Sequence, residues 1–133
     1  MIFSLDTNTC IRYISGRAPK LRLKLPTIPS GEIIVCSVVR AELFYGAAKS
    51  QTPNQSLTKQ TRFLRPYATV AFDDMAATAY AQLRAYLETR GIPIGGNDML
   101  IAAIALAHNL ILVTHNTSEF SRVPGLQIED WEV

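Results

Sequence analysis

Apolar and polar positions follow one another in a pattern that predicts short strands separated by helices. Apolar runs rich in β-branched residues predict strands at residues 2–5, 33–36, 69–72 and 110–114, with a last short strand near 126–128. Helical patterns predict helices over 7–15, 38–49, 54–65, 74–89 and 97–108, and a loop at 26–31. Gly16 and Gly91 mark two helix ends, while Pro53 and Pro66 bracket the third helix.

Strands that alternate with helices indicate an α/β fold with a parallel sheet. The expected architecture is a three-layer α/β/α sandwich around a short, mainly parallel sheet of four or five strands. A chain of 133 residues is expected to form a single domain, residues 1–133. Ligands of such sheets bind at the carboxyl ends of the strands. Candidate chemistry is therefore expected in side chains that follow a strand.

Composition excludes several classes of protein. Hydrophobic residues make up 48% of the chain and charged residues 18%, which excludes intrinsic disorder. The longest apolar run, residues 99–107, is far shorter than the roughly 18 residues that span a bilayer. No basic segment precedes an apolar stretch at the N-terminus, so no signal peptide is expected. Two cysteines, Cys10 and Cys36, are too few for a disulfide framework, and we expect reduced thiols in a cytoplasmic protein with no membrane partner.

The net charge of +2 conceals an asymmetry between the two parts of the chain. Residues 1–72 carry ten basic and three acidic residues, a balance of +7, whereas residues 73–133 carry a balance of −5. A basic half of this kind favours a polyanionic partner such as a nucleic acid. An ordinary solvated surface explains the charge equally well, so charge alone does not decide between the two.

Four of the eleven acids stand where the fold predicts a site. Asp6 follows the first strand, Asp98 opens an apolar helix after Gly95, and Glu119 follows the strand at 110–114. Glu42 belongs to helix 38–49, whose apolar neighbours predict burial. Each acid has a plain structural alternative, which is a helix cap for Asp6 and Asp98 and a solvated position for the two glutamates.

The four acids carry more information together than singly. Carboxylates that converge at one sheet edge raise one another's pKa unless a cation neutralises them. Hard divalent cations with oxygen ligands, Mg²⁺ or Mn²⁺, meet that requirement. The two histidines suggest no acid–base pair, because a capping role suffices for His108 and a surface position for His115.

A different aspartate enzyme, a phospho-aspartate receiver or phosphohydrolase built around Asp6, is a poorer match. Such enzymes use a lysine late in the chain, and the last lysine here is Lys59. Phosphohydrolases also need an acid two residues after the nucleophile, where this chain has Asn8. No glycine-rich nucleotide-binding motif is present either, because Gly95-Gly96 lacks the spacing.

Four short segments, in this order, resemble the PIN-domain ribonucleases, specifically the VapC-type toxins of bacterial toxin–antitoxin pairs. They are Leu5-Asp-Thr-Asn8, Ala41-Glu-Leu-Phe-Tyr-Gly46, Gly95-Gly-Asn-Asp-Met-Leu-Ile-Ala-Ala103 and Leu112-Val-Thr-His-Asn-Thr-Ser-Glu-Phe120. The ending Arg122-Val-Pro-Gly-Leu-Gln-Ile-Glu-Asp-Trp131 resembles the subgroup that cleaves initiator tRNA. Each motif is short, but the four in order are specific, and the resemblance covers nearly the whole chain.

The resemblance implies a Mg²⁺- or Mn²⁺-dependent endoribonuclease that hydrolyses RNA, with tRNA as the expected substrate. It assigns the catalytic, metal-binding role to Asp6, Glu42, Asp98 and Glu119, and a supporting or phosphate-binding role to Asn8, Thr114 and Asn116. Many relatives carry an acid where this chain has Asn116, so either Glu119 or Asn116 completes the site. The resemblance also implies a homodimer and a cognate antitoxin that blocks the acidic pocket. The alternative is a catalytically inactive PIN-like module that binds RNA or a partner.

Overall fold

A four-stranded parallel sheet forms the centre of the molecule in a computed structural model that describes residues 1–133. Its strands are β1 (Phe3–Leu5), β2 (Ile33–Ile34), β3 (Ile111–Val113) and β4 (Ile128–Glu129), in the spatial order β2-β1-β3-β4. Phe3 pairs with Ile33 on one side and Ile111 on the other, and Leu112 pairs with Ile128. The two central strands are buried along their whole length, and apart from the buried Ser4 their residues are apolar.

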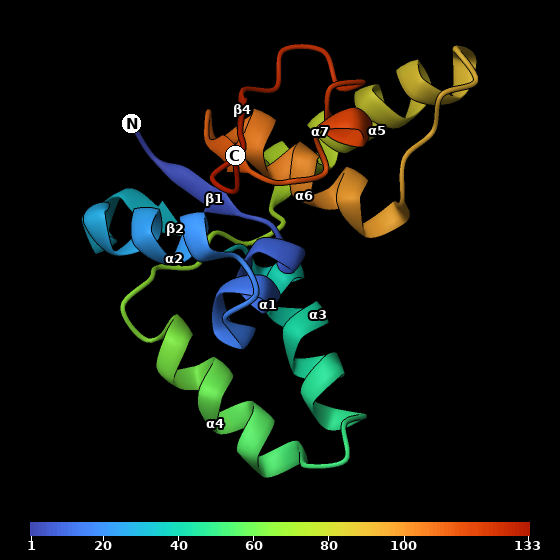
Figure 1. Ribbon diagram of the computed structural model, residues 1–133. Coiled ribbons are helices and arrows are strands. Elements are labelled where there is room, and N and C mark those ends of the chain that lie inside the picture. Colours follow the sequence, from blue (N-terminus) through green and yellow to red (C-terminus); the bar gives the residue numbers. More distant parts are fainter.

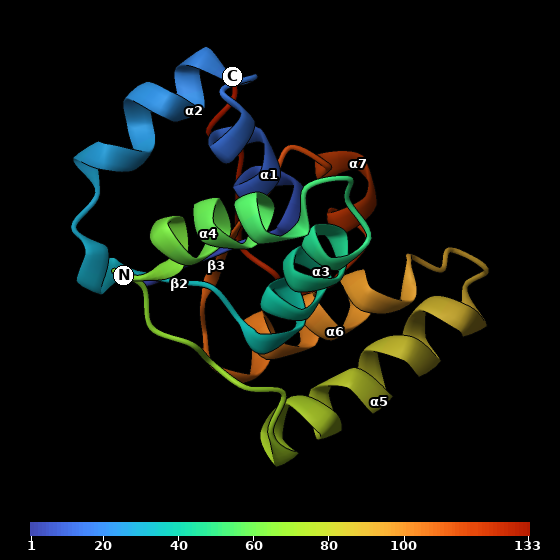
Figure 2. The same cartoon turned by 90° about the horizontal axis from the view of Figure 1, so that it is seen from below.

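Helices surround this sheet (Figures 1 and 2). They are α1 (Thr7–Ser15), α2 (Pro19–Lys24), α3 (Ser37–Ala48), α4 (Pro53–Leu64), α5 (Asp74–Thr89), α6 (Gly96–Ala107) and α7 (Thr117–Phe120), with two 3₁₀ turns at Leu25–Thr27 and Ser30–Glu32. In Figure 2, α5 and α6 lie on one side of the sheet and α1 and α2 on the other. Helices α3 and α4 form a hairpin that extends away from the sheet (Figure 1). This arrangement confirms the expected layered α/β class.

The hydrophobic core is one cluster of 29 buried residues. Helix α6 contributes most to it, since Met99 and residues 101–105 are all buried. This position explains the uniformly apolar sequence of that helix. Near the C-terminus, Trp131 packs edge-on against Phe3 of β1, with ring centroids 5.0 Å apart. None of the helices has the length and hydropathy that crossing a bilayer requires.

The prediction of a strand at residues 69–72 is wrong, and the sheet has four strands. The segment runs beside β2 but forms only one bridge, between Ile34 and Ala68, followed by a backbone hydrogen bond from Ser37 N–H to the Val70 carbonyl. The guanidinium of Arg40 donates to the Val35 and Tyr67 carbonyls at this point. The side chain of Arg40 therefore satisfies backbone carbonyl groups that a longer β-ladder would otherwise satisfy.

The sequence pattern did not predict two short helices, α2 and α7. Helix α2 has the sequence Pro-Lys-Leu-Arg-Leu-Lys, whose alternation of polar and apolar residues has the period of a strand, not of a helix. Helix α7 is a single turn of four residues, too short to show any period.

Helix α3 is less buried than its apolar sequence predicts. Only Val39, Leu43 and Ala47 are buried, while Phe44 and Tyr45 are 40% and 66% exposed. The face that carries Leu43 packs inward, and Glu42 beside it is half-buried.

Candidate active site

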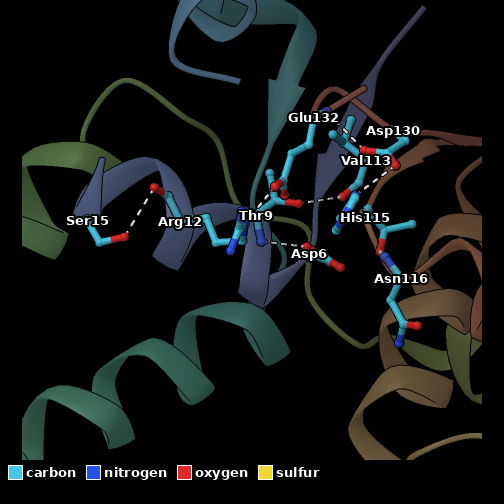
Figure 3. Close-up of polar contacts among 10 residues, drawn as sticks. Asp6, Thr9, Arg12, Ser15, Val113, His115, Asn116, Asp130 and Glu132 are labelled. Atoms are coloured by element: carbon cyan, nitrogen blue, oxygen red, sulfur yellow. Dashed lines mark hydrogen bonds and ion pairs between the residues drawn. The ribbon is translucent and has the colours of Figure 1, made fainter. Parts of the chain in front are cut away.

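Asp6 lies at the carboxyl end of β1, in the middle of the sheet. Its side chain is almost fully buried, and its Oδ1 accepts a 2.8 Å hydrogen bond from Thr9 N–H, which caps α1 (Figure 3). Burial raises the pKa of Asp6, although hydrogen bonds from Thr114 and Thr9 counteract the increase. Asp6 is therefore a helix cap and, at the same time, a buried acid at the sheet edge where ligands bind.

Asp98 and Glu119 come together from different elements. Asp98 is the third residue of α6, is half-buried and makes no capping hydrogen bond, so the structural alternative of a helix cap does not account for it. Its carboxyl group lies within hydrogen-bonding distance of that of Glu119 on α7. Glu119 is held from two sides, because its Oε1 accepts a 2.8 Å hydrogen bond from Gly95 N–H and its Oε2 accepts one from the Asn116 amide.

The pKa values of Asp98 and Glu119 are shifted in opposite directions. Burial and the neighbouring charge of Glu119 raise the pKa of Asp98 to about 7, and the charges of Glu42 and Asp6 add to the increase. Burial also disfavours the charged form of Glu119, but the hydrogen bonds from Gly95 and Asn116 outweigh it and lower the pKa of Glu119. At neutral pH, Asp98 thus holds a proton for much of the time beside an ionised Glu119.

Glu42 is fixed between two other helices. Its Oε1 accepts a hydrogen bond from the hydroxyl of Thr7 on α1, and its Oε2 accepts a 3.3 Å hydrogen bond from the amide of Asn97 on α6. Sequence reasoning missed both donors. Their only signal was their place in the chain, since Thr7 directly follows Asp6 and Asn97 directly precedes Asp98.

The three polar residues expected to support the acids differ in their positions. Thr114 is fully buried at the end of β3, and its hydroxyl accepts the N–H of Asn116 at 3.0 Å. Asn116 donates its side-chain amide to Glu119, so the two residues that were candidates to complete the site are in direct contact. Asn8 is exposed on the first turn of α1, and its side chain has no hydrogen-bond partner.

A glycine permits the close approach of Asp98 and Glu119. A Cβ atom on Gly95 would lie 3.3 Å from Asp98 Oδ2 and 3.7 Å from Glu119 Oε1. Gly95 has a φ of −56°, which any residue adopts, so space and not backbone conformation makes glycine useful here.

Both histidines pair with acids outside this group. His108 follows α6 and its Nε2 lies 2.8 Å from Asp73 Oδ2, while His115 Nδ1 lies 2.9 Å from Asp130 Oδ2 (Figure 3 shows the latter pair). Neither imidazole therefore hydrogen-bonds to any of the four acids at this edge of the sheet.

The chemistry of this cluster fits a hard divalent cation. Its candidate ligands are carboxylate oxygens, and burial together with the neighbouring acidic charges raises the pKa of Asp98, a cost that a bound cation would remove. No three acidic, histidine or cysteine side chains converge closely enough to surround one ion as they stand. A cation would therefore have to replace the proton of Asp98 and draw the carboxylates together.

Comparisons with known proteins agree with this fold. The family model described as "PIN domain" matches residues 4–126. The chain is 41% identical over 129 residues to the tRNA(fMet)-specific endonuclease VapC of Shigella flexneri, covering 97% of each chain. Among solved structures, it is similar to VapBC2 from Rickettsia felis bound to a promoter DNA fragment, with a TM-score of 0.93, 38% identity, and coverage of 98% of this chain and 99% of that chain. The DNA-bound VapBC of Salmonella typhimurium gives a TM-score of 0.93 at 37% identity, with 98% of each chain covered.

Proposed function

The chain belongs to the PIN-domain family, among the VapC ribonucleases, and from this membership we propose that it is an endoribonuclease toxin that depends on Mg²⁺ or Mn²⁺. The observation that carries the proposal is the group of acids at the carboxyl end of the sheet, in which Asp98 has a pKa of about 7. A carboxyl group perturbed by burial and like charges, at the edge where parallel sheets bind ligands, is typical of an active site.

We assign metal binding and catalysis to Asp6, Glu42, Asp98 and Glu119. A bound Mg²⁺ or Mn²⁺ would supply an activated water and neutralise charge on the phosphate. The protein's own contribution is orientation, because Thr7 and Asn97 hold Glu42 while Gly95 and Asn116 hold Glu119. Water attacks phosphorus, the bond to the 3′-oxygen breaks and that oxygen takes up a proton, which leaves a 5′-phosphate and a 3′-hydroxyl.

We further propose tRNA as the substrate and a VapB-type antitoxin as the inhibitor. The Shigella relative is named for tRNA(fMet), and the solved relatives are VapBC complexes. The basic balance of residues 1–72 favours a polyanionic substrate. A homodimer in the cytoplasm completes the proposal, and the two buried free cysteines are compatible with a reducing compartment.

The decisive test compares Asp98→Asn with Asp74→Asn, which removes the same charge from an exposed acid in the first turn of α5. Mg²⁺ or Mn²⁺ at a hundred times its Kd should stabilise the wild type and Asp74→Asn by about 2.7 kcal/mol, and both should cleave RNA. Asp98→Asn should lose cleavage and most of the stabilisation together. Thermal unfolding and a gel assay of tRNA cleavage measure the two effects.

Four outcomes would contradict separate parts of this proposal. Cleavage that persists in EDTA would exclude the metal mechanism, and normal cleavage by Asp98→Asn would exclude the site. A wild type that binds RNA without cutting it would favour the inactive binding module. Sequenced cut ends that lie outside tRNA anticodon loops would overturn the tRNA assignment alone.

A further inference from the structure

A hollow of about 530 Å³ separates α2 from the C-terminal tail that follows β4. Its lining includes Lys20, Lys24 and Thr27 from the α2 side and Glu129, Asp130 and Trp131 from the tail. None of the four proposed catalytic acids lines it. The hollow is therefore a feature of its own, beside the acidic cluster.

The acids that line the hollow already have partners. Asp130 binds His115 Nδ1 through Oδ2 and accepts the backbone N–H of Glu132 through Oδ1, each at 2.9 Å. Glu129 accepts a 2.9 Å hydrogen bond from the indole N–H of Trp131. Each acid thus has a hydrogen-bond donor that partly compensates its charge, and each is half-buried.

The lysines on the other side have no such partner. Lys20 and Lys24 are exposed, and neither forms an ion pair. Lys24 lies with its Nζ 5.8 Å from the centre of the Trp131 ring, at the wall of the hollow. Arg17, which precedes them, and Arg22, which lies between them in the sequence, are also exposed and free of ion pairs. The hollow therefore has a basic wall along α2, whose lysines form no ion pair, and an acidic wall along the tail, whose carboxylates already accept hydrogen bonds.

The topology places this positive charge close to the acids. Thr114 N–H donates to the Glu129 carbonyl, and Asp6 N–H donates to the Val113 carbonyl, so β1, β3 and β4 end side by side. Two strand spacings, about 10 Å, separate the end of β1 from the end of β4. An extended nucleic-acid strand that enters the acidic cluster can therefore continue across the end of β4 into the hollow.

We infer that the hollow between α2 and the C-terminal tail binds a backbone phosphate of the RNA next to the cleaved bond, with Lys20 and Lys24 as positioning residues. The inference rests on the proposed ribonuclease function, since it names where the substrate of that active site is held. Lysine ammonium groups attract phosphate without reading bases, so this contact contributes affinity and orientation and not sequence specificity.

The test uses the full chain carrying Asp98→Asn, so that RNA is bound but not cut. Lys20→Gln/Lys24→Gln is compared with Lys49→Gln/Lys59→Gln, which removes two exposed lysines from the α3–α4 hairpin. The control is closely matched, because Lys49 lies over the Tyr45 ring as Lys24 lies over Trp131. The Kd for a single-stranded RNA oligonucleotide is measured over a range of salt concentrations, and thermal unfolding verifies that all variants fold.

The loss of one phosphate contact should reduce the slope of log Kd against log salt concentration by about 0.7, so the α2 variant should lose about 0.7 and the control nothing. In protein that retains Asp98 and therefore cleaves RNA, the two α2 substitutions should raise KM and leave kcat unchanged. An unchanged slope in the α2 variant, or an equal loss in the control, would overturn the inference.

Failure of the inference and failure of the proposed function give different results. A wild type that cleaves RNA while the α2 variant binds and cleaves equally well refutes the inference alone. A wild type that cleaves no RNA, but loses RNA binding selectively through the α2 substitutions, refutes the ribonuclease function and retains the binding site.

Discussion

At the scale of single residues, the site depends on how closely carboxyl groups approach one another. Asp98 lies in the first turn of α6, where the helix dipole favours a negative charge. Burial and the charge of Glu119 nevertheless raise its pKa to about 7, so the repulsion and lost hydration outweigh the dipole. The backbone of Gly95 lies against both acids and donates its N–H to Glu119.

Gly95→Ala should therefore reduce activity without unfolding the protein. The added methyl group would lie 3.3 Å from Asp98 Oδ2, tighter than ordinary contact, and would displace the carboxyl group. We expect a loss of RNA cleavage of roughly tenfold to a hundredfold, as small displacements of catalytic groups commonly produce. Gly96→Ala is the matched control, since a Cβ there meets nothing within 4 Å. Equal activities of the two variants in a tRNA cleavage assay would refute this view of Gly95.

At the scale of elements, the C-terminal tail is held far more firmly than its length suggests. Strand β4 has two residues, but Trp131 beyond it is buried against Phe3 and donates its indole N–H to Glu129. The next residue, Glu132, pairs with Arg12 of α1 at 2.7 Å. These contacts join the tail to β1 and α1 and keep one wall of the hollow in place.

Trp131→Ala should destabilise the fold by roughly 3–5 kcal/mol, the usual cost of removing a large buried aromatic side chain. Trp131→Phe should cost less, because it keeps much of the apolar contact and loses chiefly the hydrogen bond to Glu129, worth about 1 kcal/mol. Urea unfolding monitored by circular dichroism measures both. A cost for Trp131→Ala below that of the phenylalanine variant would show that the tail does not belong to the cooperative core.

At the scale of the whole molecule, the clustered acids couple stability to pH. The pKa of Asp98 is about 7 in the folded protein against an ordinary value of 3.8. Between these values the folded state binds more protons than the unfolded chain, so the free energy of unfolding falls as pH rises. Asp6 acts in the same direction because burial raises its pKa. The lowered pKa values of Glu119 and Asp73 act oppositely, in more acidic solution.

The metal-free wild type should therefore lose stability as pH increases from about 4.5 to 7.5, in the window set by Asp98. Asp98→Asn should flatten this dependence, because asparagine cannot titrate. Saturating Mn²⁺ should reduce or reverse the loss in the wild type by favouring ionised carboxylates. Urea unfolding in EDTA and in Mn²⁺ across this range provides the measurement. Parallel curves for wild type and Asp98→Asn would contradict the assigned pKa.

Much of the architecture could be predicted from local pattern. The ranges of α1, α3, α4, α5 and α6 agree with the predicted helices to within a residue or two. The failures occurred where local pattern is ambiguous or short. Helix α2 alternates like a strand, α7 is one turn, and the expected strand at 69–72 is an apolar segment with a single bridge to β2. In each case, contacts with distant parts of the chain decided the structure.

The sequence by itself determined the order of strands and helices, the family, and the placement of Asp6, Asp98 and Glu119 near strand ends or helix starts. Only the tertiary structure decided that Asp98 contacts Glu119, that Thr7 and Asn97 hold Glu42, and that α2 faces the tail across a hollow. The physical reason is the strand order β2-β1-β3-β4, which brings together residues tens of positions apart. Periodicity along the chain reports which face of an element is apolar, but not which element packs on that face.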